Sequence, residues 1–131
     1  MQKPVSLAAA LVLALTLIFS LAPAALAVPM ELPVKNQVTL LDFGANQCVP
    51  CRMMAPILAE VKQEYAGAAA VVVLDVWQER SLTDQYGIRV IPTQIFYDRS
   101  GKEYLRHEGF MPKERIEMVL KALGVTKPSR P

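Results

Sequence analysis

Apolar and polar positions alternate along the chain in a way that predicts a strand, a helix and a second strand after residue 37. Residues 38–43 form a short apolar run of the buried-strand kind. Residues 51–66 carry apolar side chains at helical spacing, with charged side chains on the other side. Residues 70–77 are dense in β-branched side chains, which is typical of a central parallel strand buried on both faces.

The second half of the chain predicts shorter elements. These are a short helix, two strands joined by a turn, and a closing helix, over residues 79–86, 90–97, 102–107 and 112–123. Gly87 and Gly124 follow the two helices, and Pro112 opens the second of them. The order β-α-β-α-β-β-α predicts an α/β domain with a mixed central sheet and helices on both faces.

The N-terminal segment has the layout of a secretory signal. Lys3 precedes an uncharged run over residues 5–22, and Ala25 and Ala27 supply the small side chains that a signal peptidase requires. The run approaches the ~20 residues that cross a bilayer, so an uncleaved membrane anchor is the alternative. Both interpretations place the folded part outside the cytoplasm, in the periplasm or an equivalent compartment.

These features divide the 131 residues into four segments. We expect a signal over 1–27, an extended lead-in over 28–37, one folded domain over 38–123 and a C-terminal tail over 124–131. The net charge of +2 falls to +1 without Lys3, and the basic residues are scattered. This balance excludes nucleic acid as a partner on electrostatic grounds.

The chain has two cysteines, Cys48 and Cys51. A structural disulfide is the usual expectation for an exported protein, but a bridge that closes so small a loop stabilises little, so the spacing favours a redox switch. If Cys48 lies at the N-terminal end of the helix, the helix dipole lowers its pKa, and Cys51 is the shielded, resolving thiol. Pro50 can occupy the first helical turn without strain.

Two segments give the chain a family resemblance. Residues 41–56, LDFGANQCVPCRMMAP, resemble the active-site block of the thioredoxin family, and residues 86–93, YGIRVIPT, resemble its second signature. The likeness covers about residues 38–123. It implies the thioredoxin fold, a monomer, and thiol-disulfide exchange with protein substrates.

The resemblance also assigns roles to individual residues. Cys48 becomes the nucleophile and Cys51 the resolving thiol, while Val49 and Pro50 between them influence the redox potential. Pro92 becomes a cis-proline beside the cysteines, and the backbone of Ile91 pairs with an extended substrate segment. Asp42 becomes a buried acid of raised pKa that accepts the proton of the resolving thiol. No cofactor and no metal is implied.

Three departures from the family pattern limit this transfer. Gln47 and Gly44 stand where the family has tryptophans, and Val73 stands where a lysine often neighbours the buried acid. Only about ten residues separate the predicted signal from the first predicted strand, so the family's N-terminal strand and helix are shortened or absent. Trp77, the single tryptophan, is expected to serve in packing.

The direction of exchange and two other functions stay open. Pro50 and Asp42 favour a reductase, whereas export favours an oxidase or isomerase unless a membrane partner supplies electrons. A copper(I) site is one alternative, since Cys48 and Cys51 are soft ligands with Met53, Met54 and His107 as candidate companions. A scaffold with an inert disulfide is the other.

Overall fold

A computed structural model describes residues 31–129 of the chain. Its helices and strands are, in chain order, β1 (Val38–Gly44), α2 (Val49–Glu64), β2 (Ala69–Asp75), α3 (Ser81–Tyr86), β3 (Thr93–Tyr97), β4 (Glu103–Glu108) and α4 (Lys113–Ala122). The predicted element order is confirmed. The predicted signal over residues 1–27 lies outside the described residues. Within residues 31–129, no helix has the length and apolar character needed to cross a bilayer.

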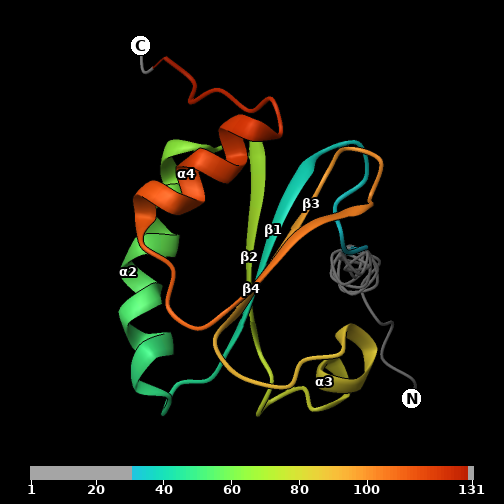
Figure 1. The fold of residues 1–131 in the computed structure, drawn as a ribbon, viewed down its shortest axis with the longest axis vertical. Coiled ribbons are helices and arrows are strands. Elements are labelled where there is room, and N and C mark those ends of the chain that lie inside the picture. The colour runs from blue at the N-terminus through green and yellow to red at the C-terminus, as the bar shows by residue number, and fades with distance from the viewer. Residues whose placement is uncertain (1–30, 130–131) are drawn as a thin grey trace, which may run out of the picture.

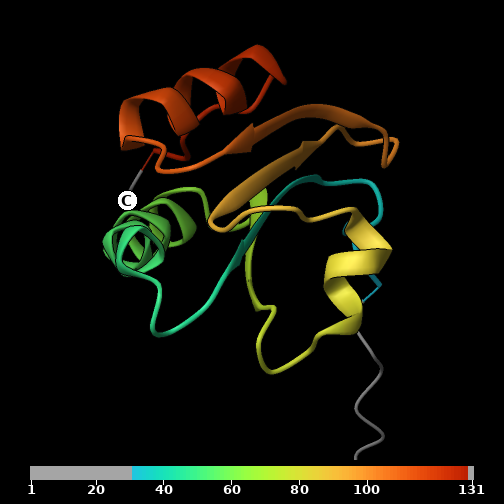
Figure 2. The ribbon, with the colours of Figure 1, turned by 60° about the horizontal axis from the view of Figure 1, so that its bottom comes forward.

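The strands form one mixed sheet in the order β2-β1-β3-β4. β1 runs parallel to β2 and antiparallel to β3, and β3 forms an antiparallel hairpin with β4. α2 and α4 cover one face of the sheet and α3 covers the other, as Figures 1 and 2 show. The predicted fold class, a mixed sheet with helices on both faces, is therefore confirmed.

β1 holds the two layers together because side chains alternate between the faces of a strand. Leu40 belongs to the core under α2 and α4, whereas Leu41 and Phe43 belong to the core under α3. The rings of Phe43 and Tyr86 lie 4.9 Å apart, centroid to centroid, and attach α3 to the sheet. Every residue of β1 is buried, so the strand that leads into the cysteine pair is held firmly in the core.

The prediction of a central strand buried on both faces over residues 70–77 is wrong. β2 ends at Asp75 and pairs with β1 alone among the described residues, and the side chain of Val73 is 57% exposed. β-Branched composition favours a strand but does not fix its position in the sheet, which depends on whether another strand joins its outer edge. Trp77 follows in a loop and is half exposed, so the packing role expected for it is also wrong.

The third strand begins later than the predicted residue 90. β3 starts at Thr93, because Pro92 has no N–H to donate to a ladder. The residues before it form a loop that two hydrogen bonds hold in place. Thr93 Oγ1 donates to the carbonyl of Val90 at 2.8 Å, and Gly109 N–H donates to the carbonyl of Pro92 at 2.8 Å. Both hydrogen bonds hold the end of the loop that enters β3.

Both ends of the described chain differ from the predicted boundaries. The lead-in is not extended throughout, because the N–H of Gln37 donates to the carbonyl of Val34 at 3.2 Å and closes a turn. At the other end Val125 is buried in the core, and Lys127 Nζ lies 2.7 Å from a carboxylate oxygen of Glu64 on α2. The packing therefore continues past residue 123.

Candidate active site

The two cysteines lie where the chain turns from β1 into α2. Cys48 is the N-cap of the helix, with extended backbone angles, and Pro50 lies in the first turn. Cys48 and Cys51 form a disulfide with their Cα atoms 5.2 Å apart. The Sγ of Cys48 also accepts a hydrogen bond from the N–H of Cys51 at 3.3 Å. The reactive pair is thus part of the helix cap itself.

The two sulfur-bearing residues differ in accessibility. Cys48 is half-buried and its neighbours Val49 and Pro50 are exposed, whereas Cys51 is only 8% exposed. A thiol from outside therefore meets Cys48 first. The free N–H groups and dipole of the α2 N-terminus stabilise an anion at this position, which favours the thiolate of Cys48 in the reduced protein.

The loop before β3 lies against the cysteine pair. The Sγ of Cys48 is 4.0 Å from the carbonyl oxygen of Ile91, a residue 43 positions further along the chain. The Ile91–Pro92 peptide bond is cis, and Pro92 is buried whereas Ile91 is partly exposed. The structure therefore brings together four of the residues singled out in the sequence, with the backbone of Ile91 beside the accessible sulfur.

Asp42 is buried on β1, on the face that carries α2. Burial raises the pKa of its carboxyl group to about 6, because the low-dielectric surroundings disfavour the charged form. The side-chain amide of Gln94 donates a hydrogen bond to Asp42 Oδ1 at 2.8 Å and offsets part of this increase. Asp42 is therefore an acid that changes its charge close to neutral pH.

A cavity of about 280 Å³ between α2 and β2 connects Asp42 with Cys51. Gly44 lines it as well, and a Cβ atom at this position would lie 3.2 Å from the Cβ of Cys51. Glycine thus lets the start of α2 approach β1 closely. Val73, at the position of the family's lysine, and the exposed Lys62 also line the cavity, which gives Asp42 and Cys51 a shared route to solvent.

Gln94 is a site residue that the sequence interpretation missed. It is fully buried on β3, directly opposite Asp42 in the ladder between β1 and β3. Its Oε1 has no hydrogen-bond partner among the described residues. A polar amide inside an apolar strand requires a polar partner, and this was the available signal. The partner itself lies 52 residues away in the chain and could not be named from the pattern.

The described residues give the cysteines no third metal ligand. No group of three histidine, cysteine or acidic side chains suited to a metal ion occurs within residues 31–129. His107 Nε2 instead lies 3.1 Å from the carbonyl oxygen of Phe110. Met54 is buried in the core, where its sulfur accepts the N–H of Met111 at 3.3 Å. No contact of the site favours a copper centre.

Comparisons with known proteins agree with this geometry. Residues 29–122 match the family model for thioredoxin. The chain is 39% identical over 87 residues to a thioredoxin of Staphylococcus aureus (strain Mu50 / ATCC 700699), an alignment that covers 66% of this chain and 83% of that protein.

Solved structures show the same likeness. Chloroplastic thioredoxin z superimposes with a TM-score of 0.63 at 28% identity, covering 68% of this chain and 80% of the other. The pneumococcal exposed lipoprotein thioredoxin of Streptococcus pneumoniae strain TIGR4 superimposes with a TM-score of 0.60 at 26% identity. This superposition covers 67% of this chain and 86% of the other. A family match over most of the chain, together with a disulfide between cysteines three residues apart at a helix start, leads to one conclusion: the chain belongs to the thioredoxin family and is a thiol-disulfide oxidoreductase.

Proposed function

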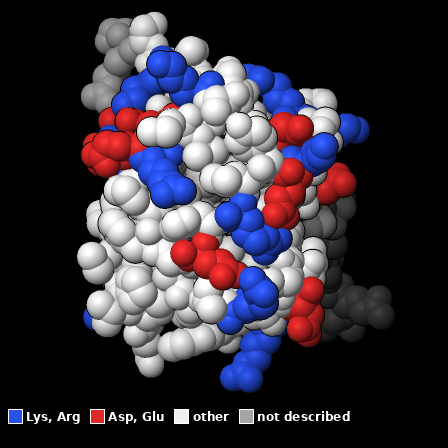
Figure 3. Space-filling view, in the orientation of Figure 1, with Lys and Arg blue, Asp and Glu red and all other residues white. Residues whose placement is uncertain are grey.

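We propose that this protein reduces disulfide bonds of other proteins outside the cytoplasm. The observation that carries the proposal is the position of Cys48, an accessible sulfur at a helix N-terminus 4.0 Å from the carbonyl oxygen of Ile91. An extended client that pairs with the backbone of Ile91 brings its own disulfide next to this sulfur. The surface over the start of α2 carries few charges, as Figure 3 shows at lower left, so it suits many polypeptides.

The reaction exchanges one disulfide for another. In the reduced protein, the Cys48 thiolate attacks one sulfur of the client disulfide, and the other client sulfur leaves as a thiolate that takes up a proton. The Cys51 thiol then loses its proton and attacks Cys48 Sγ, which expels the second client sulfur. The client gains two electrons and two protons, and the pair becomes the disulfide seen in the structure.

Asp42 is the base that serves the second step in this proposal. With a pKa of about 6 it is mostly ionised at neutral pH, and it faces the same cavity as Cys51, through which a proton can pass. Gln94 suits both charge states of Asp42. Its amide N–H donates to the carboxylate, and after rotation its free Oε1 can accept the O–H of the protonated acid.

Two features support reduction as the physiological direction. Pro50 is retained between the cysteines, and Asp42 is available to take the proton of Cys51 when this thiol expels the client from Cys48. A reductase in an oxidising compartment needs a renewed supply of electrons, and we propose a dithiol donor at the membrane. The protein itself acts as a monomer.

A redox titration of the Cys48–Cys51 pair tests the direction. Equilibration of the protein in graded ratios of reduced and oxidised dithiothreitol should give a potential nearer about −270 mV than about −120 mV, the values typical of a reductant and an oxidant of this fold. Trapping the free thiols with a mass-adding reagent measures the reduced fraction. A potential near the oxidising value would contradict the reductase assignment.

Export is supported by the N-terminal sequence and by one relative. Residues 1–27 have the layout of a secretory signal, and the pneumococcal structural neighbour is an exposed lipoprotein thioredoxin by name. We expect the full chain, expressed in a bacterium, to appear outside the cytoplasm with Val28 as its first residue. Cell fractionation and N-terminal sequencing measure this. An intact N-terminus in the cytoplasmic fraction would refute it.

A further inference from the structure

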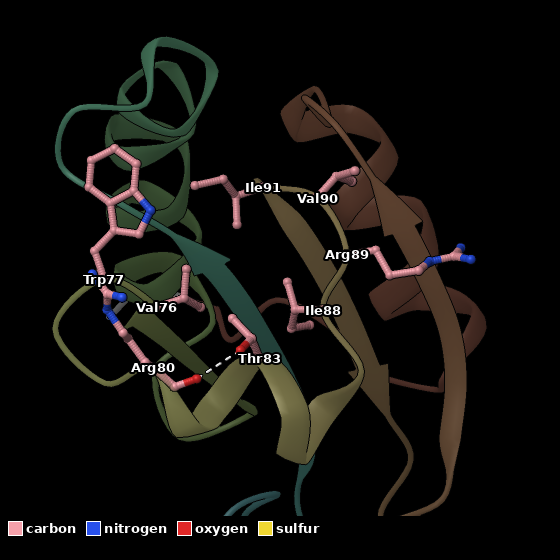
Figure 4. Close-up of a pocket in the computed structure, with 8 residues that line it drawn as sticks. All are labelled: Val76, Trp77, Arg80, Thr83, Ile88, Arg89, Val90 and Ile91. Atoms are coloured by element: carbon pink, nitrogen blue, oxygen red, sulfur yellow. Dashed lines mark hydrogen bonds between the residues drawn. The ribbon is translucent and has the colours of Figure 1, made fainter.

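A groove of about 440 Å³ begins at Ile91 and runs away from the cysteines toward α3. We call it the Trp77 groove. It is bounded by the loop that follows β2, by α3 and by the loop before β3, and Figure 4 shows the side chains that line it. Ile91 belongs to the groove through its side chain and to the active site through its carbonyl oxygen, which is 4.0 Å from Cys48 Sγ. A polypeptide that leaves the reacting sulfur along Ile91 therefore enters the groove.

The walls of the groove are apolar and exposed. The ring of Trp77 stands on one side and Val90 on the other, with 53% and 46% of their surfaces exposed, while Val76 lies buried at the base (Figure 4). The loop that carries Trp77 is held by Asp75, whose Oδ1 accepts the N–H of Trp77 at 2.9 Å and that of Gln78 at 3.1 Å. An aromatic side chain on a fixed loop binds at a low cost in conformational entropy.

The charged side chains that line the groove are all basic. Arg80 and Arg89 are among its lining residues, and no acidic side chain is. Arg89 points away from the groove in Figure 4 and forms an ion pair with Glu108 at 3.2 Å. Arg80 takes part in none of the ion pairs found within residues 31–129, and it lies on the same side as Trp77. A cation without an acidic partner beside an apolar wall is complementary to an acidic residue next to an apolar one.

We propose that the Trp77 groove selects clients in which an acidic and an apolar residue flank the disulfide-bonded cysteine. The apolar side chain packs against Trp77 and Val90, and the carboxylate pairs with Arg80. This inference rests on the proposed function, because it names the substrate class of the same site. A basic residue in the same place of the client meets Arg80 and is disfavoured by like charge.

Two peptide disulfides that differ in one residue test the proposal. Both carry a leucine beside the cysteine, followed by glutamate in one and lysine in the other. The second-order rate constant for reduction is measured with excess reduced full-length protein at low ionic strength. We expect the glutamate peptide to react about 3- to 10-fold faster, and the ratio to shrink in ~1 M salt.

Three variants locate the preference. In Arg80→Gln the ratio between the two peptides should fall to about one, and in Trp77→Ala both peptides should slow. Arg115→Gln is the matched control, since Arg115 is an exposed arginine of α4 and lies outside the groove. All three variants should reduce 2-hydroxyethyl disulfide, a small neutral substrate, at the wild-type rate.

The outcomes separate this inference from the proposed function. If wild-type protein reduces both peptides at the same rate, the groove does not select clients. The same holds if Arg80→Gln keeps the preference for the glutamate peptide. Neither result would contradict the proposed function as a reductase. If wild-type protein reduces neither the peptides nor 2-hydroxyethyl disulfide, the proposed function itself fails. Trp77 is the only tryptophan, so its fluorescence should also change when the oxidised protein binds a cysteine-free glutamate peptide. Unchanged fluorescence would contradict binding of the peptide in the Trp77 groove.

Discussion

Replacement of Cys48 by serine is expected to abolish reduction of insulin disulfides, with a loss of at least ~1000-fold, because the alcohol cannot replace the thiolate that attacks the client. Replacement of Cys51 should have a different result. Cys51 is nearly buried and is needed only to expel the client, so Cys51→Ser should accumulate as a mixed disulfide through Cys48. The turbidity of precipitating insulin chains measures the first effect, and non-reducing electrophoresis detects the trapped complex.

Met53→Leu is the matched control for both cysteine variants. Met53 lies two residues after Cys51 on α2 and is about half exposed, so the replacement keeps the fold and the cysteines. It should reduce insulin like the wild type. Undiminished turnover in Cys48→Ser would rule out thiol-disulfide exchange at this site. Stoichiometric copper(I) that the protein retains against a chelator, and loses in Cys51→Ser, would instead revive the metal-binding alternative.

Asp42→Asn is expected to stabilise the protein by up to about 3 kcal/mol at pH 8. The pKa of Asp42 rises from 3.8 to about 6 on folding, and each tenfold change in proton binding corresponds to about 1.4 kcal/mol. A raised pKa in an acid means that the folded state binds the proton more tightly than the unfolded state does. The charged carboxylate therefore destabilises the fold. Asparagine removes the charge and keeps an oxygen that can accept from Gln94.

The pH dependence gives the sign of this effect. The charged carboxylate of Asp42 lowers the free energy of unfolding. This destabilisation is absent below pH 3.8, increases as the pH rises, and reaches its full value above about pH 6. Urea unfolding of the oxidised wild type and Asp42→Asn should give equal stabilities near pH 4 and a difference that levels off above pH 6. Gln94→Leu removes the donor that favours the carboxylate, so it should move the pKa of Asp42 further upward. Equal stabilities at pH 8 would show that Asp42 titrates normally.

Local patterns in the sequence were sufficient for much of the fold. The order of helices and strands follows from apolar spacing, glycine and proline. The helical periodicity predicts a helix from residue 51, and α2 begins two residues earlier, at Val49, directly after Cys48. These features depend on neighbours in the chain. The closeness of Ile91 to Cys48 is different, because it is a contact over 43 residues. It was expected from the family resemblance and not from periodicity.

Contacts between residues far apart in the chain could not be predicted from local sequence patterns. The hydrogen bond between Asp42 and Gln94 exists because the register of β1 and β3 places these residues opposite each other. The exposure of Val73 depends on which strands join the outer edge of β2, a matter that composition does not decide. Trp77 lies on the rim of a groove because β2 stops two residues before it.

The first turn of α2 is capped by the same sulfur that reacts. In most helices the N-cap oxygen of a serine or aspartate is chemically constant, but here the acceptor for the N–H of Cys51 changes with every step of the cycle. An anionic sulfur is a strong acceptor and a sulfur bonded to a client is a weak one. We therefore expect fraying of the first turn of α2 to depend on the chemical state of Cys48. The rate at which the Cys51 amide exchanges its hydrogen with solvent should therefore differ between the reduced protein and the mixed disulfide.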